Sequence, residues 1–244
     1  MTYRSNGTFE TEPVLTSSTI GLVQSRFMTQ TYGWMFLGLL ITAGVSLGVT
    51  SSESALQMIA ENRGIFYGVL IAEFILVLGL TAASQRISAA TATLGFLLYS
   101  ALNGITFSLI FMLYTATSIG QVFFVAAGMF GGMAVFGSVT KRSLSGLGTF
   151  MAMGLWGIIL VSLVNIFIRS ESLSLGTSAI AILVFSGLTA YDAQKIKSLA
   201  AQYSQGPGND QAERKGAIFG ALTLYLDFVN LFLSLLRIFG NRRN

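Results

Sequence analysis

The sequence predicts an all-α, polytopic membrane protein with seven transmembrane helices. Of its 244 residues, 53% are hydrophobic and only 10% are charged, whereas a soluble domain has about 25% charged residues. The longest uncharged run covers residues 87–140. A transmembrane β-barrel would instead alternate polar and apolar residues along its strands, so these long apolar runs rule it out.

Each span needs roughly 20 largely apolar residues. The run 87–140 is long enough for about two crossings at about 1.5 Å rise per residue, and we place its break near residues 115–120. The predicted spans, in order, are residues 34–50, 65–84, 89–114, 120–139, 147–168, 175–191 and 216–237. The chain then has a polar cytoplasmic N-terminal segment, 1–33, one seven-helix transmembrane domain, 34–240, and a short basic tail, 241–244.

Basic residues favour a cytoplasmic N-terminus, because cytoplasmic loops carry an excess of Lys and Arg. In that orientation most basic residues lie inside, and the N-terminal segment, which lacks a signal-peptide core, is retained. The C-terminal Arg242 and Arg243 then fall outside. A re-entrant last helix or a miscounted span would place this tail in the cytoplasm instead.

Composition also excludes several classes of function. The chain has no Cys and no His, so zinc sites, thiol catalysis and haem ligation built on those residues are excluded, and we expect no cofactor. Sensing of protons near neutrality would fall to carboxyl groups. The net charge of +4 is spread over short loops and does not indicate a nucleic-acid partner.

The last span, 216–237, combines an almost wholly apolar surface with one polar stripe. Steps of four and three residues keep side chains on one helical face. The stripe consists of Gly216, Gly220, Thr223, Asp227, Asn230, Ser234 and Arg237. Such a stripe should face other helices or a water-filled cavity rather than lipid.

Two aspartates could carry the chemistry of this protein. A charge at the bilayer centre costs from about 3 to over 10 kcal/mol, so such residues are paired, hydrated or protonated. Asp227 lies deep in the last span; either it has an ion or proton role, in a site that Asn230 could share, or it is a neutral acid that ties helices together. Asp192 ends the sixth span, either as an ordinary interfacial acid or slightly inside the membrane boundary.

Two further charges accompany them. Arg86 ends the second span; it sets the topology or forms a cytoplasmic ion pair with Asp192. Glu73 lies inside the same span with no basic residue deep in any other, so it should be protonated or meet water or a cation. Two nearby carboxylates cannot both ionise cheaply, and hard cations such as calcium prefer carboxylate ligands. A pair of them could serve as cation site and pH sensor.

Two C-terminal segments carry a resemblance: LTAYDAQKIK at 188–197 and GALTLYLDFVNLFLSLLRIFG at 220–240. With the seven spans and the Tyr-Gly-Trp entry to the first, the chain resembles the Bax inhibitor-1 family, especially its bacterial inner-membrane members. The resemblance implies a central last helix wrapped by the other six and a pH-sensitive calcium leak. It also implies that Asp192 and Asp227 form the sensor, that Arg86 latches one of them, and that a membrane-anchored protease is a potential partner.

We therefore weigh three functions. The first is a passive calcium-permeable channel in which the deprotonated aspartates hold Arg86 and protonation favours opening; Glu73, Thr223, Asn230 and Ser234 would support the ion path. The second is a regulator of a membrane protease or stress response without transport. The third, an intramembrane aspartyl protease, is disfavoured because Leu-Tyr-Leu-Asp-Phe lacks the Gly-x-Gly-Asp pattern, so we expect no enzyme.

Overall fold

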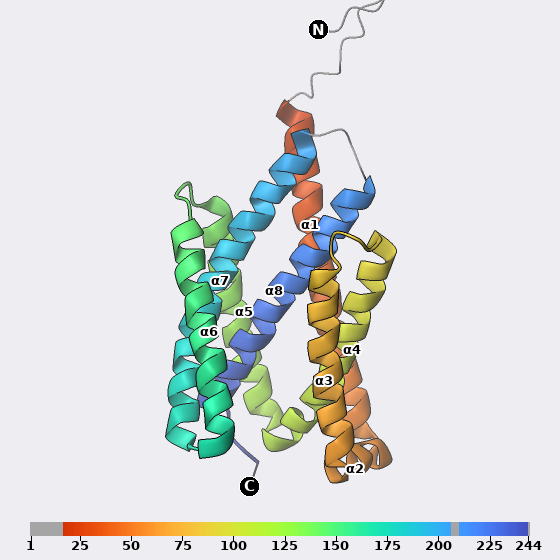
Figure 1. Ribbon diagram of the computed structural model, residues 1–244, viewed down its shortest axis with the longest axis vertical. Helices are drawn as coiled ribbons and strands as arrows, with labels where there is room; N and C mark the ends of the chain where they lie inside the picture. Colours follow the sequence, from red (N-terminus) through yellow and green to blue (C-terminus); the bar gives the residue numbers. More distant parts are fainter. Residues whose placement is uncertain (1–16, 206–209, 244) are drawn as a thin grey trace, which may run out of the picture.

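A computed structural model describes residues 17–205 and 210–243, which form eight helices (Figure 1). They are α1 (Ser17–Ser51), α2 (Glu53–Glu61), α3 (Arg63–Ala82), α4 (Ala89–Leu113), α5 (Ala116–Val139), α6 (Ser145–Ile168), α7 (Glu171–Gln205) and α8 (Asp210–Phe239). All except the short α2 are long and apolar enough to cross a membrane, so the predicted class of seven spans is confirmed. The predicted turn at residues 206–208 lies outside the described residues.

The seven long helices run alternately up and down (Figure 1). The α8 helix traverses the whole molecule, so it is not re-entrant, and the C-terminal end lies opposite the end where α1 begins. The α3–α4 and α5–α6 connections lie at the end of the molecule where α1 begins; they carry Arg86, Lys141 and Arg142. The α6–α7 turn, with Arg169, lies at the other end.

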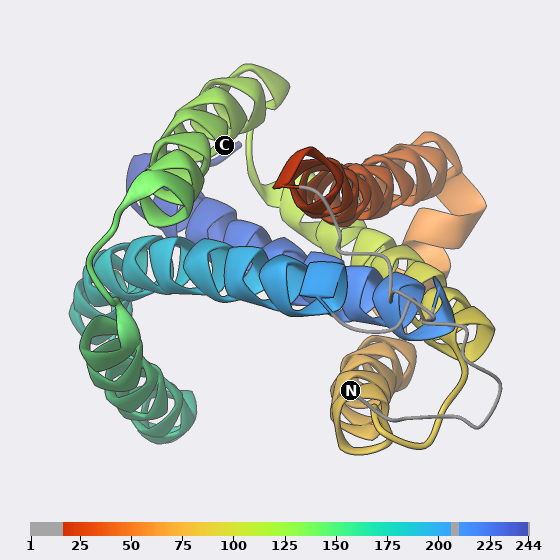
Figure 2. The ribbon, with the colours of Figure 1, turned by 90° about the horizontal axis from the view of Figure 1, so that it is seen from above.

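The α8 helix is central, as predicted. It has the largest buried share of any span and packs on α1, α4, α5 and α7. The implied wrapping by six helices is wrong, however: α3 packs mainly on α4, and α6 packs on α7. Figure 2 shows α3 and α6 standing apart from each other on the same side of α7. Their large apolar side chains stay exposed because lipid, not protein, would cover them.

Two helices extend beyond their predicted ends. The α1 helix begins at Ser17 rather than at Trp34, so the predicted boundary at residue 33 falls inside it. It continues because Phe27 and Thr31 are fully buried, and the Phe27 ring lies 5.5 Å from the ring of Tyr203. Residues 1–16 of the predicted N-terminal segment lie outside the described residues.

The α7 helix likewise continues to Gln205, so the polar stretch after Asp192 is helical and not a loop. Its extension is buried at Ala193, Ile196 and Ala200, which pack into the core. The sequence alone indicated a loop there because charged residues alternate with these small apolar ones.

The basic tail is held against the α4–α5 connection. Thr115 donates its backbone N–H to the carbonyl of Asn241 at 3.1 Å, and Arg243 donates to Leu113 at 2.9 Å. Asn241 donates its N–H to Ser118 Oγ at 2.9 Å. These bonds fix the end of α8 to α4 and α5.

Candidate functional site

Asp192 of α7 and Asp227 of α8 lie together in the interior. They are only 9% and 5% exposed, and their carboxyl groups lie close enough to interact directly. Two carboxyl groups in one buried place cannot both ionise cheaply. The second oxygen of Asp227, Oδ2, is buried without a hydrogen-bond partner within the described part of the chain. The pair therefore offers a free oxygen to a water molecule or a cation.

The antiparallel packing of α7 and α8 brings the aspartates together. A Cβ on Gly216 would meet the ring of Tyr203 at 2.9 Å, and one on Gly220 would meet Ile196 at 3.3 Å. At the other end of the seam, Arg237 donates to Ser174 Oγ at 3.1 Å. The predicted stripe of α8 therefore borders α7, and its glycines allow the close approach that membrane helices need.

The segment around Asp192 is fixed by α5 and α6. A Cβ on Gly137 of α5 would overlap the backbone of Ala190, and one on Gly148 of α6 would lie 2.5 Å from the ring of Tyr191. These two close approaches flank Asp192 on neighbouring helices. They hold its backbone in place, so its carboxyl group cannot easily turn away from α8.

Polar residues just beyond Asp192 complete this support. Gln194 accepts a hydrogen bond from the Leu144 N–H at 2.8 Å and donates to the Arg142 carbonyl at 2.9 Å. Lys197 donates to the Ser138 carbonyl at 2.6 Å, which caps the end of α5. Neither Gln194 nor Lys197 was among the predicted site residues. Their spacing of three residues, which puts both on one face of a helix, was the available signal.

Asp227 is oriented by the opposite face of α8. Tyr225 is fully buried, and its hydroxyl lies 2.7 Å from that of Thr42 on α1. Two residues along a helix are turned about 200° from each other. Anchoring Tyr225 to α1 therefore directs Asp227 toward α7.

The other polar residues of the stripe do not bond to the aspartates. Thr223, Asn230 and Ser234 are half-buried, and each donates to the carbonyl four residues earlier in α8, at 3.0, 2.8 and 2.7 Å. They share the helical face of Asp227 but satisfy their donors locally. This leaves the Asn230 side-chain oxygen as a further acceptor on that face.

Glu73 belongs to a different part of the molecule. Its Oε1 accepts a hydrogen bond from Thr106 Oγ1 at 2.5 Å, between α3 and α4. Because α3 packs mainly on α4, Glu73 is not brought to the aspartate pair. The side-chain partner of Glu73 inside the membrane span is therefore the neutral hydroxyl group of Thr106.

Arg86 lies exposed in the turn between α3 and α4, and within the described ranges no ion pair joins it to an aspartate. Lys215 of α8 donates to the Ile87 carbonyl at 3.4 Å and so ties this turn to the start of α8. Lys215 precedes Asp227 by about 12 residues, or roughly 18 Å along the helix. In this conformation Arg86 is separated from the pair.

The two aspartates provide too few oxygen ligands to hold a calcium ion tightly. Calcium takes about six to eight oxygen ligands, and among the described residues no group of three or more acidic, His or Cys side chains gathers. Two carboxyl groups alone could bind such an ion only if it kept much of its water.

Comparison with known proteins gives consistent matches along the chain. The family model described as "Inhibitor of apoptosis-promoting Bax1" matches residues 24–244. "Inner membrane protein YbhL" of Escherichia coli K12 is 50% identical over 217 residues, which cover 89% of this chain and 92% of the relative. A protein of Borreliella burgdorferi is 41% identical over 91% of this chain and 95% of its own length. A membrane protein of Streptococcus pyogenes serotype M1 is 39% identical over 93% of this chain and 96% of its own.

Proposed function

Since this chain belongs to the Bax inhibitor-1 family, we propose that it is a pH-sensitive, calcium-permeable cation leak channel gated by Asp192 and Asp227. We place it in the bacterial inner membrane, where the name of its Escherichia coli relative puts that protein, with its N-terminus in the cytoplasm. The observation that carries the proposal is the buried carboxyl pair between α7 and the central α8.

Burial makes this pair hard to explain as a structural contact alone. Ionisable groups inside a membrane protein are costly and mark ion or proton paths. The pair lies on the α8 face that also carries Thr223, Asn230 and Ser234, which offer oxygen atoms along the same direction. This face gives a cation a polar route across an otherwise apolar bundle.

Gating in this proposal depends on a proton held by the pair. Loss of this proton leaves two carboxylates in one buried place, where they repel each other and attract a cation. In the proposed closed state Arg86 supplies that cation and blocks the path. Acidification neutralises the pair, weakens the latch and favours opening.

To close the channel in this proposal, Arg86 must move to the aspartate pair, and α3, which precedes it, must move with it. This helix packs mainly on α4 and on the short α2, and its only buried apolar side chain is Leu80. Its position at the rim of the bundle allows it to shift without breaking the α7–α8 seam. The separated Arg86 of this structure corresponds to the unlatched state.

The test is calcium flux into proteoliposomes measured across pH. We expect flux to rise as pH falls, and Asp192→Asn and Asp227→Asn to remove this pH dependence because neither amide titrates. Asp210→Asn, an exposed change on the same helix, is the matched control and should behave like the parent protein. Unchanged flux and unchanged pH response in both pair variants would refute the proposal.

A regulatory role without transport is the competing function. Purified protein would then give no flux at any pH yet co-purify with a membrane-anchored protease. If the Asp192→Asn and Asp227→Asn variants still bound that partner, the regulatory role would not depend on the aspartate pair.

A further inference from the structure

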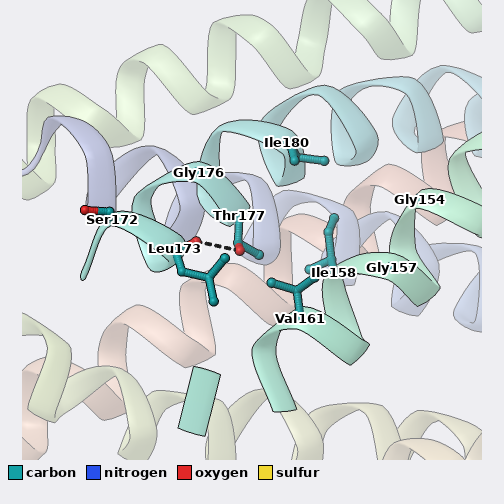
Figure 3. Close-up of a pocket in the computed structure, with 9 residues that line it drawn as sticks. All are labelled: Gly154, Gly157, Ile158, Val161, Ser172, Leu173, Gly176, Thr177 and Ile180. Carbon is teal, nitrogen blue, oxygen red and sulfur yellow. Dashed lines mark hydrogen bonds between the residues drawn. The ribbon is translucent and has the colours of Figure 1, made fainter. Parts of the chain in front are cut away.

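An apolar groove runs between α6 and α7, near the end where the C-terminus lies (Figure 3). Its volume is about 440 Å³, within the range of about 300–1,000 Å³ typical of ligand sites. Three glycines widen it: Gly154 and Gly157 of α6 and Gly176 of α7. A Cβ on Gly157 or Gly176 would meet nothing within 4 Å, so the space beside them is open.

The lining suits a hydrocarbon chain. Apart from three glycines and two hydroxyl residues, it consists of aliphatic side chains. Thr177 Oγ1 donates to the Leu173 carbonyl at 2.7 Å, drawn as a dashed line in Figure 3, so this hydroxyl is already satisfied. A polar ligand would lose its hydrogen bonds to water here, whereas an alkyl chain would lose none.

The α6–α7 turn, which precedes the lining residue Ser172, carries a positive charge. Arg169, between α6 and α7, is exposed and has a left-handed backbone with φ of 55°. Asn165 Oδ1 accepts from the Ser170 N–H at 2.9 Å, and Ser170 Oγ accepts from the Leu173 N–H at 3.3 Å. These bonds hold Arg169 at the tip of the turn, beside the N-terminal end of the 35-residue helix α7. Helix N-termini also favour anions.

The neighbouring charges leave this turn positive. Glu171 faces Arg242 at 3.8 Å, and within the described residues no ion pair engages Arg169. Arg237 and Arg243 lie at the same end of the molecule. An apolar groove whose lining on α7 begins three residues after Arg169 matches an amphiphile with an anionic head.

We propose that this groove binds an anionic phospholipid, with an acyl chain between α6 and α7 and the phosphate at Arg169. From Ser172 to Ile180 the groove follows α7 for about 12 Å. A chain entering from the headgroup level would run down this length along the helices. An apolar helix from a partner or a second copy would fill the groove but leave Arg169 unmatched. The proposal is independent of channel activity.

Native mass spectrometry of the purified full-length protein, titrated with phosphatidylglycerol and phosphatidylcholine of identical acyl chains, tests the headgroup. We expect the first phosphatidylglycerol to bind about tenfold more tightly, the effect of one charge-assisted hydrogen bond. Arg169→Gln should remove this preference, whereas Arg243→Gln, at the same end, should keep it. Equal affinity of the parent protein for both lipids would overturn the proposal.

Filling the groove tests the acyl chain. Gly176→Leu should weaken binding of both lipids at the first site, and Gly157→Leu is a second variant that fills the same space from α6. Gly79→Leu on the exposed face of α3 is the control, because a Cβ there also meets nothing within 4 Å. All variants should have the same melting temperature as the parent protein when it is measured in phosphatidylcholine, which shows that they fold. Unchanged lipid binding in a folded groove variant, or a lipid-free dimer, would refute the site.

Discussion

At the scale of single residues, glycines determine where helices can touch. Gly137 faces the backbone of Ala190, next to Asp192, and leaves no room for a side chain. Gly132, in the same helix, faces open space, as does Gly128. Sequence alone does not distinguish these positions, because glycine is frequent throughout membrane helices.

Gly137→Ala should therefore destabilise the protein by about 1–3 kcal/mol, because the added methyl group overpacks the α5–α7 contact. Gly132→Ala should be neutral or stabilise by about 0.5–1 kcal/mol, since alanine is the better helix former. Thermal unfolding in one detergent measures both. Similar melting temperatures for the two variants would contradict the assigned contact.

The buried tyrosine of α8 makes a second prediction. Thr42 Oγ1 lies 2.9 Å from the Ser100 carbonyl, which accepts its proton, so Tyr225 donates to Thr42. Tyr225→Phe should cost about 1 kcal/mol through loss of this bond. A double-mutant cycle with Thr42→Val measures the coupling, and Tyr67→Phe, at a 59% exposed position, is the control. Additive effects would show that the bond contributes nothing.

At the scale of elements, α7 organises the polar half of the site. Its Asp192 faces α8, whereas its Gln194 and Lys197 hold the α5–α6 connection and the end of α5. One helix thus supplies both a carboxyl group of the pair and the bonds that fix its neighbours. This dual use requires the helix to continue past Asp192, which it does as far as Gln205.

Gln194→Ala should loosen the α5–α6 connection without unfolding the bundle. Backbone amides of residues 140–145 should exchange with solvent about tenfold faster, because two hydrogen bonds across the connection are lost. Gln202→Ala, an exposed change on the same helix, should leave the exchange rates there unchanged. Hydrogen exchange followed by mass spectrometry gives the comparison, and equal rates in both variants would argue against this bracing.

At the scale of the whole molecule, seven crossings put the start of α1 and the end of α8 on opposite sides of the membrane (Figure 1). The central α8 packs on α1, α4, α5 and α7, while α3 packs mainly on α4 and α6 packs on α7. This uneven arrangement gives the two outer helices different tasks in our proposals. The α3 helix can move and carry Arg86, and α6 forms one wall of the lipid groove.

Reporter fusions test this topology. Alkaline phosphatase fused after Asn244 should be active, because the C-terminus lies outside when the N-terminus is cytoplasmic. A fluorescent protein fused at the same point should remain dark after export, and one at the N-terminus should fluoresce. Fluorescence from both fusions would place both ends in the cytoplasm and contradict seven full crossings.

The sequence by itself determined the class of this protein. A helix that crosses the apolar core of a bilayer needs a long run of apolar residues, and such runs are visible in the sequence. It placed the spans, marked Asp227 as deep, and through the segments around Asp192 and Asp227 pointed to the family that the comparisons confirm. Those features depend only on residue order and helical periodicity.

Only the tertiary structure decided which residues meet. Burial of Asp192, the proximity of the two aspartates, the anchoring by Gln194 and Tyr225, and the separation of Glu73 and Arg86 depend on contacts between distant segments. Such contacts depend on how helices rotate and tilt against each other. A periodic pattern identifies the polar or apolar face of one helix, but it does not identify which face of which other helix packs against it.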